Sequence, residues 1–201
     1  MSHPGSPLPS LILLVRHGAT EWSLNGRHTG RTDLPLVELG EYQSRAVGPV
    51  IHELLDGADP LVFSSPLQRA LHTAKLAMPD HEATVVDALA EYDYGRYDGL
   101  TSTEIFEQDP DWNLFTDGCP GGEGPNQVAA RCDSFIAKLE RTAGGRAVVA
   151  FTHGHLGRIL TVRLLGLGVE AAAGLWNETA TVGVINVHRG RFVLVGWNLR
   201  G

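Results

Sequence analysis

The sequence has little of what disulfide-rich domains, metal centres and membrane proteins are built from. Its 201 residues include only two cysteines, Cys119 and Cys132, and neither lies in the spacing of a zinc site. No apolar run approaches the roughly 18 residues that a membrane-spanning helix needs. No P-loop, no reactive-cysteine loop and no Asp-x-Asp nucleophile at the end of an apolar run occurs either. We therefore expect a cytoplasmic protein with no membrane association, no cofactor and no metal.

Positive charge is also scarce. The chain has 16 Lys and Arg against 23 Asp and Glu, a net charge of −7, which argues against nonspecific nucleic-acid binding. Between Tyr97 and Ala130 there is no Lys or Arg at all. The acids of this segment are Asp98, Glu104, Glu107, Asp109, Asp111, Asp117 and Glu123. If the segment overhangs a binding site, it is poorly suited to bind a second anionic group of a highly anionic substrate.

Length and composition fit one globular domain. Hydrophobic residues make up 43% and charged residues 19% of the chain. Residues 1–10 contain three prolines and no basic region, so we expect a flexible N-terminal tail rather than a signal peptide or anchor. Residues 11–201 are expected to form a single domain with an insertion at about 97–124.

Three short apolar runs end in residues that carry chemistry. They are residues 11–15, 61–63 and 147–151. The first run leads into Arg16 and His17, the second into a helix that carries Arg69, and the third into His153. In open α/β sheets, ligands bind beyond the carboxyl ends of the strands. Two histidines and two guanidiniums at one sheet edge suit a dianion, most simply a phosphate.

Helical periodicity and turn residues predict the remaining elements. The expected helices are 39–55, 66–77, 126–141 and 156–165, and further strands are expected at 85–86, 182–187 and 192–197. Pro49 should end or kink the first helix, and Ser65 should cap the second. The order predicts a three-layer α/β/α sandwich with a mostly parallel central sheet. The closing hairpin offers an edge strand, so a homodimer is one open alternative.

Smaller features belong to the insertion and to the aromatic residues. Thr101 and Glu104 have the spacing of a capping box, which predicts a short helix. Trp112, Phe115 and Trp176 are assigned to packing, because most aromatics near insertions anchor them.

Phosphoryl transfer from a monoester needs an anion cradle, an in-line nucleophile and an acid for the leaving oxygen. His17 is the best nucleophile that the chain offers. A neutral imidazole nitrogen attacks phosphorus when the other ring nitrogen keeps its proton on an acceptor. Water would then hydrolyse the covalent phosphohistidine.

Four segments resemble the histidine phosphatase superfamily, which has the phosphoglycerate mutase-like fold. They are residues 15–22, 64–70, 89–95 and 152–155, and the resemblance covers nearly the whole chain. It implies that His17 is phosphorylated and that Glu91 protonates the leaving alcohol. It also implies that Arg16, Arg69 and His153 hold the phosphoryl group, and that no metal takes part.

The chain is most similar to small acid phosphatase-like and sugar-bisphosphate phosphatase-like members of the superfamily. Residues 27–36 and 112–123 carry this likeness. Beside Arg16, Arg69 and His153, it implies substrate contacts at five further positions, which are Ser23, Thr29, Gly30, Tyr94 and Gly154. Ser23 stands where mutases place an asparagine, and the insertion lacks the arginine pair that mutases carry there.

Three residues keep alternative interpretations. His155 either caps the helix that follows it or approaches the site. Arg27 and Arg31 either form a second anion site for a bisphosphate or are solvated turn residues.

The resulting hypothesis is a phosphomonoesterase that hydrolyses small-molecule phosphate esters through a phosphohistidine intermediate. Because Glu91 must carry a proton in the first step, its burial would favour an acidic pH optimum. The alternatives are a cofactor-dependent phosphoglycerate mutase and a noncatalytic module that binds a phosphorylated ligand.

Overall fold

The apolar runs form the strands of one mixed sheet. The computed structural model describes residues 7–201, and within them the sheet has six strands in the order β3-β2-β4-β1-β5-β6. The strands are β1 (Leu11–Arg16), β2 (Leu61–Ser64), β3 (Thr84–Val85), β4 (Val148–Thr152), β5 (Val182–His188) and β6 (Arg191–Leu199). Strands β1 to β4 pair in parallel, and β5 and β6 add an antiparallel hairpin at one edge.

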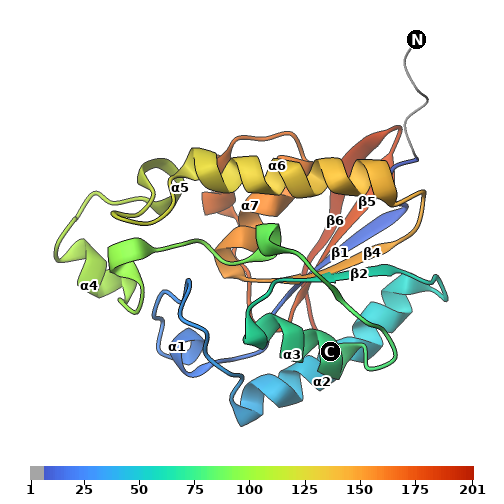
Figure 1. Ribbon diagram of the computed structural model, residues 1–201, viewed down its shortest axis with the longest axis horizontal. Helices are drawn as coiled ribbons and strands as arrows, with labels where there is room; N and C mark the ends of the chain where they lie inside the picture. The colour runs from blue at the N-terminus through green and yellow to red at the C-terminus, as the bar shows by residue number, and fades with distance from the viewer. Residues whose placement is uncertain (1–6) are drawn as a thin grey trace.

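Helices cover both faces of the sheet (Figure 1). The α-helices are α1 (Glu21–Leu24), α2 (Glu38–Leu55), α3 (Gln68–Ala77), α4 (Ser102–Phe106), α5 (Leu114–Asp117), α6 (Pro125–Thr142) and α7 (Gly154–Leu164). Three 3-10 helices connect them, which are η1 (Asp87–Leu89), η2 (Gly95–Tyr97) and η3 (Val169–Gly174). Helix α1 and the 3-10 helices were not predicted, because segments of three to six residues are too short to show helical periodicity.

The alternation of side chains along β1 divides the core into two clusters. Leu13 and Val15 pack with residues of α2 and α3, whereas Ile12 and Leu14 pack with residues of α6 and α7. All four side chains are buried, as expected for a strand covered on both faces. The predicted three-layer α/β/α sandwich with a mostly parallel sheet is confirmed.

Pro49 was predicted to end or kink the first helix. It does not end the helix, since α2 continues from Glu38 to Leu55. Proline cannot donate to the carbonyl of Arg45, one turn earlier. Pro49 is exposed, so water reaches that carbonyl and the helix continues. Gly48 is needed beside it, because a Cβ there would lie 2.7 Å from the carbonyl oxygen of Ala77 at the end of α3.

The second helix starts later than predicted. Helix α3 begins at Gln68, and Ser65 is not its N-cap. The cap comes from a distant loop, because the carboxylate of Asp33 accepts a hydrogen bond from the backbone N–H of Gln68 at 2.9 Å. The Ser65 hydroxyl accepts from the backbone N–H of Leu67, just before the helix, at 3.2 Å, and it lies 2.7 Å from Nε2 of His153. Ser65 therefore connects the start of α3 to the site.

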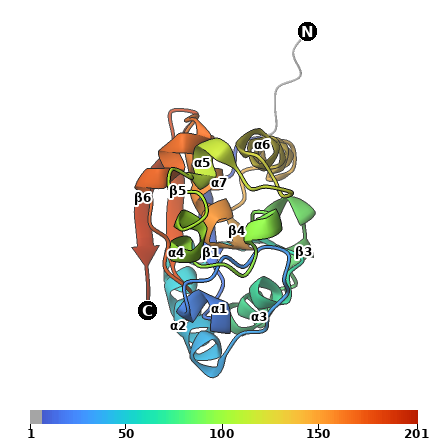
Figure 2. The ribbon, with the colours of Figure 1, turned by 90° about the vertical axis from the view of Figure 1, so that its left-hand side faces the viewer.

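The insertion holds α4 and α5 at the end of the molecule where α1 also lies (Figure 2). The predicted capping box is confirmed, since Thr101 and Glu104 each accept from the other's backbone N–H. Trp112 and Phe115 are buried, so their assignment to packing is confirmed. For Trp176 the assignment was wrong, because this side chain is 66% exposed.

The two ends of the domain have different surroundings. Residues 1–6 of the expected tail lie outside the described residues, while Pro7 and Ser10 exchange backbone hydrogen bonds with Gly145 and Arg146. Strand β6 is an edge strand of the sheet, as the hairpin prediction required. Among residues 7–201 no helix has the length and apolar character needed to cross a membrane.

Candidate active site

The chemistry-bearing residues meet at the carboxyl ends of three neighbouring parallel strands. Strand β4 lies between β1 and β2, so the residues that follow these strands come to one edge of the sheet. The ring centroids of His17 and His153 are 5.2 Å apart in an edge-to-face arrangement. The prediction that these strand ends meet at one edge of the sheet is confirmed by the topology.

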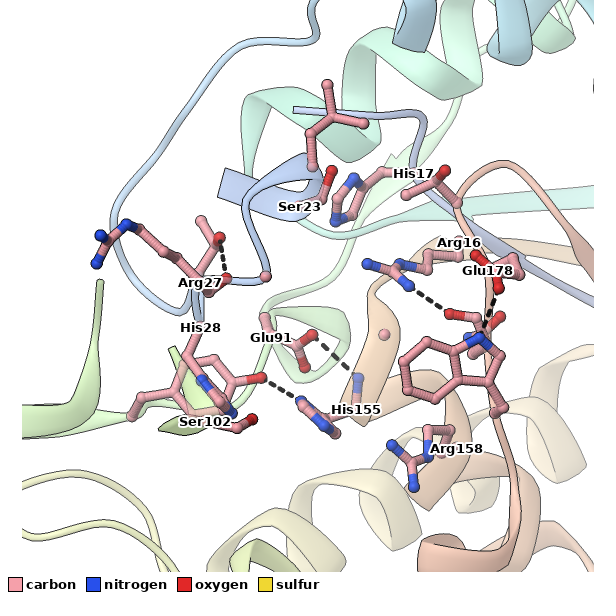
Figure 3. Close-up of a pocket in the computed structure, with 18 of the residues that line it drawn as sticks. Arg16, His17, Ser23, Arg27, His28, Glu91, Ser102, His155, Arg158 and Glu178 are labelled. Atoms are coloured by element: carbon pink, nitrogen blue, oxygen red, sulfur yellow. Dashed lines mark hydrogen bonds between the residues drawn. The ribbon is translucent and has the colours of Figure 1, made fainter. Parts of the chain in front are cut away.

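A cavity of about 460 Å³ opens at this edge (Figure 3). The predicted site residues that line it are Arg16, His17, Ser23, Thr29, Glu91, Tyr94 and Gly154. Arg69, His153 and Gly30 are not among the residues that line the cavity. The site therefore has a layer that faces the cavity and a layer behind it.

The ring of His17 is held in the tautomer that a nucleophile needs. Nδ1 lies 2.7 Å from the carbonyl oxygen of Gly18, and because a carbonyl only accepts, Nδ1 carries the proton. Nε2 is then the ring nitrogen with a free lone pair. Burial, together with the positive charges of Arg69 and Arg16, holds the pKa of His17 well below its usual value of 6.5. The imidazole is therefore neutral at neutral pH.

Arg16 provides an unused donor next to His17. Its Nη1 donates to the backbone carbonyl of Asn177, whereas its Nε is buried with no hydrogen-bond partner in the described part of the chain. Gly154 lies against the guanidinium, where a Cβ would come within 3.3 Å of the Cζ atom. A buried N–H without a partner is costly, so this donor points to an anionic ligand that would satisfy it.

Arg69 and His153 form the layer behind His17. Nε of Arg69 donates to Nδ1 of His153 at 3.2 Å, which leaves the proton of His153 on Nε2, facing Ser65. The Nη groups of Arg69 donate to backbone carbonyls of Thr29, Gly30 and Thr32. Burial and the charge of Arg69 also hold the pKa of His153 well below 6.5. Direct contact of Arg69 and His153 with a phosphoryl group stays a prediction.

Glu91 enters the cavity from the segment between η1 and η2. Its side chain is 5% exposed, and its carboxylate accepts backbone hydrogen bonds from Tyr92, His155 and Leu156 at 2.8–3.1 Å. Two of these donors belong to the first turn of α7. Figure 3 shows the Glu91 carboxylate and the Arg16 guanidinium on the same side of the cavity. Glu91 is therefore fixed beside the place where the histidine and arginine converge.

Sequence reasoning left His155 undecided, and the structure places its ring in the wall of the cavity. Its Nδ1 shares a hydrogen bond of 2.5 Å with the hydroxyl of Tyr94. Burial and the nearby Glu91 raise the pKa of Tyr94 well above 10, so this hydroxyl keeps its proton. The ring of His28 stacks on His155 at 5.7 Å. These aromatic groups form part of the cavity wall.

Several other lining residues were missed by the sequence analysis. They are Leu24, Gly26, His28, Gln43, Ser102, Arg158, Trp176, Asn177, Glu178 and Thr179. Arg158 follows Gly154 by four residues on α7, which is the spacing of one helix face, so this was a usable signal. The segment 176–179 has no motif, and only the fold brings it beside Arg16.

The two turn arginines do not form a shared anion site. Arg27 lines the cavity and pairs with Glu104 at 3.0 Å. Arg31 does not line the cavity and pairs with Asp93 at 3.4 Å. The interpretation of Arg31 as a solvated turn residue is favoured, since its side chain is 57% exposed.

The insertion places few side chains at the cavity, but its acidic residues hold the neighbouring loops in place. Ser102 is the insertion residue that lines the cavity in the described part of the chain. The acidic side chains hold other loops, since Asp98 accepts from Gly30 and Thr32 and Glu104 pairs with Arg27.

Within residues 7–201, no group of three or more His, Cys, Asp or Glu side chains is arranged as metal ligands would be.

Comparisons with known proteins agree with this geometry. The model of the histidine phosphatase superfamily (branch 1) matches residues 12–200. An acid phosphatase of Mycobacterium tuberculosis is 41% identical over 181 residues, which cover 89% of this chain and 87% of the relative. The sedoheptulose 1,7-bisphosphatase of Saccharomyces cerevisiae is 34% identical over 205 residues, covering 87% and 76% of the two chains.

A solved structure gives the same answer in three dimensions. The protein of an open reading frame of Mycobacterium tuberculosis superposes with a TM-score of 0.90 at 39% identity, covering 94% of this chain and 97% of that one. The matches span the strand ends that carry His17 and His153, and they confirm the phosphoglycerate mutase-like fold. The chain belongs to the histidine phosphatase superfamily, branch 1.

Proposed function

We propose that this phosphatase hydrolyses small-molecule phosphate monoesters through a phosphohistidine at His17. One observation carries the proposal. The Gly18 carbonyl holds the proton of His17 on Nδ1, which leaves Nε2 free in a cavity where Arg16 offers an unpartnered donor. A neutral nucleophile beside an anion-binding donor is the arrangement that attack on a phosphate monoester requires.

The proposed reaction has two steps. In the first, the lone pair of His17 Nε2 forms a bond to phosphorus, the phosphorus–oxygen bond to the alcohol breaks, and Glu91 gives its proton to the departing oxygen. In the second, water attacks the phosphohistidine while the Glu91 carboxylate takes the proton of that water. The nitrogen–phosphorus bond breaks, inorganic phosphate leaves, and both residues return to their starting states.

Phosphatase activity is favoured over the mutase alternative by the insertion. A mutase has to retain a doubly phosphorylated intermediate while it reorients. The insertion offers no Lys or Arg for the second phosphate, and two of its acids, Asp98 and Glu104, are already bound to Gly30, Thr32 and Arg27. We therefore propose that the alcohol is released after the first step and replaced by water.

An acidic pH optimum is expected from the two proton positions. The nucleophile has to be neutral, and the lowered pKa of His17 keeps it neutral as the pH falls below 6.5. The proton donor has to be protonated, a form that any general acid gains as the pH falls. The nucleophile thus stays in its reactive form while the donor gains protons, so kcat/KM should be higher at pH 5.5 than at pH 7.5. A pH profile from 5 to 8 that is flat, or that falls below pH 6.5, would contradict this expectation.

The substrate class is tested by phosphate release from a panel of esters. We expect turnover of aryl, alkyl and sugar monophosphates and of sugar bisphosphates, and we expect it to persist in excess chelator because His17 and Glu91 supply the nucleophile and the acid. Interconversion of the two monophosphoglycerates, measured in parallel, should be slower than phosphate release. Faster interconversion would establish the mutase instead, and binding without any turnover would establish the noncatalytic module.

Two broader expectations remain predictions. The cytoplasmic location was predicted from the small number of cysteines, and Cys119 and Cys132 are free thiols in the structure. A homodimer would use the exposed edge of β6, whose length of nine residues is sufficient for strand pairing. Fractionation of cells and measurement of the solution mass test these two predictions.

A further inference from the structure

The segment that carries Glu91 is held by a charged residue outside the cavity. Arg131 lies on α6 and reaches the backbone of that segment with both of its Nη groups. Nη1 donates to the carbonyls of Ala88 and Ala90 at 2.9 and 2.7 Å, and Nη2 donates to the carbonyl of Glu91 at 3.1 Å. One side chain therefore fixes the backbone immediately before Glu91 and at Glu91 itself.

Glu123, from the end of the insertion, completes this arrangement. Its carboxylate pairs with Arg131 in the two-pronged geometry, with nitrogen–oxygen distances of 2.8 and 3.0 Å. The same carboxylate accepts from the backbone N–H of Asp93 at 2.9 Å, and the backbone N–H of Glu123 donates to the Asp93 carbonyl at 2.9 Å. The backbone after Glu91 is thus held as firmly as the backbone before it.

Neither residue touches the place where the chemistry occurs. Arg131 and Glu123 do not line the cavity, and their side chains are 17% and 15% exposed. Isolated surface pairs contribute little to stability, but this pair is mostly buried and makes four further hydrogen bonds to one short segment. Its position suits a support for the proton donor, because a displacement of about 1 Å at a catalytic group is enough to slow a reaction strongly.

We propose that Arg131 and Glu123 are positioning residues for proton transfer from Glu91. This inference rests on the proposed function, in which Glu91 protonates the leaving alcohol. A displaced Glu91 penalises alcohols that leave poorly without a proton, and it hardly affects a leaving group that departs as a stable anion. The consequence is a loss of activity that depends on the leaving group, which a purely structural role would not produce.

The test compares two substrates of similar size in each variant. 4-Nitrophenyl phosphate has a good leaving group, whereas benzyl phosphate releases an alcohol that needs protonation. The readout is the ratio of kcat/KM for benzyl phosphate to kcat/KM for 4-nitrophenyl phosphate, which reports the first step alone and does not change if part of the protein is unfolded. In Glu123→Gln and in Arg131→Lys we expect this ratio to fall about 10-fold or more.

A matched control is the ion pair that joins Arg163 of α7 to Asp133 of α6. Arg163 pairs with Asp133 of α6 in the same two-pronged geometry, at 2.8 and 2.9 Å, and does not reach the Glu91 segment. Asp133→Asn and Arg163→Lys should leave the ratio unchanged within about 2-fold, since these contacts do not reach the acid.

The variant Glu91→Gln separates the two claims. If its ratio does not fall, the assignment of Glu91 as the acid fails, and the inference fails with it. If its ratio falls while those of Glu123→Gln and Arg131→Lys do not, the proposed function stands and the positioning role is overturned. If all three fall, adding Glu123→Gln to Glu91→Gln should lower the ratio no further, because the acid is already lost. A further drop in the double variant would contradict a role that acts through Glu91.

Discussion

Replacement of His17 by alanine is expected to lower kcat by about 10⁴-fold or more. The imidazole Nε2 is the atom that bonds to phosphorus, and within residues 7–201 no other buried histidine has the same tautomer beside an unpartnered arginine donor. His153 has its Nδ1 bonded to Arg69 and its Nε2 to Ser65, so its lone pair is already used. Phosphate release at saturating 4-nitrophenyl phosphate measures the loss, with circular dichroism to verify that the variant is folded.

The control for this experiment is a histidine outside the site. His52 is exposed on α2 and does not line the cavity, so His52→Ala should retain the wild-type kcat. A loss of less than about 10-fold in His17→Ala would be too small for the removal of a covalent nucleophile, and it would contradict the mechanism.

Replacement of Glu91 by glutamine is expected to lower kcat/KM for alkyl phosphates by about 10²- to 10⁴-fold, the usual range for general acid catalysis. Glutamine keeps the size of the side chain and removes the transferable proton. It also replaces one oxygen by an amide nitrogen, which cannot accept a hydrogen bond. Oε1 accepts from the backbone N–H groups of Tyr92 and Leu156 and Oε2 from that of His155, so at least the bond to His155 is lost. The loss of kcat/KM for 4-nitrophenyl phosphate should be much smaller, because kcat/KM reports the first step and nitrophenolate leaves without protonation.

Benzyl phosphate and 4-nitrophenyl phosphate therefore belong in the same experiment. Glu82→Gln is the matched control, since Glu82 is exposed and lies outside the cavity. Equal losses of kcat/KM for both substrates in Glu91→Gln would show that Glu91 maintains the structure of the site but does not deliver the proton.

The fold was largely predictable because it depends on patterns that neighbouring residues create. The run at 11–15 ends at Arg16 and His17, and its continuous apolar character indicated a strand covered on both faces. Strand β1 is such a strand. The helix starting at Gln68 was misplaced because its cap, Asp33, lies 35 residues away in the sequence. The continuation of α2 through Pro49 depended on exposure, which local sequence does not specify.

The site was predictable where a residue's role follows from its own neighbourhood. His17 and Glu91 were assigned from motifs at element ends, and both line the cavity. By contrast, Asn177 reaches Arg16 from 161 residues further along the chain, and no motif marked it. Arg131 was also missed, because the helical pattern of α6 assigns it a position on the helix and gives no information about its partners.

The formation of phosphohistidine at His17 is tested most directly by trapping the intermediate. In Glu91→Gln treated with 4-nitrophenyl phosphate, the first step needs no acid, while the second lacks the base that activates water. The phosphoenzyme should therefore accumulate, with about one nitrophenolate released per active site. Quenching in alkali, digestion and mass spectrometry should then locate the phosphoryl group on His17. Release of nitrophenolate with no phosphorylated His17, or with the phosphoryl group on another residue, would contradict the mechanism.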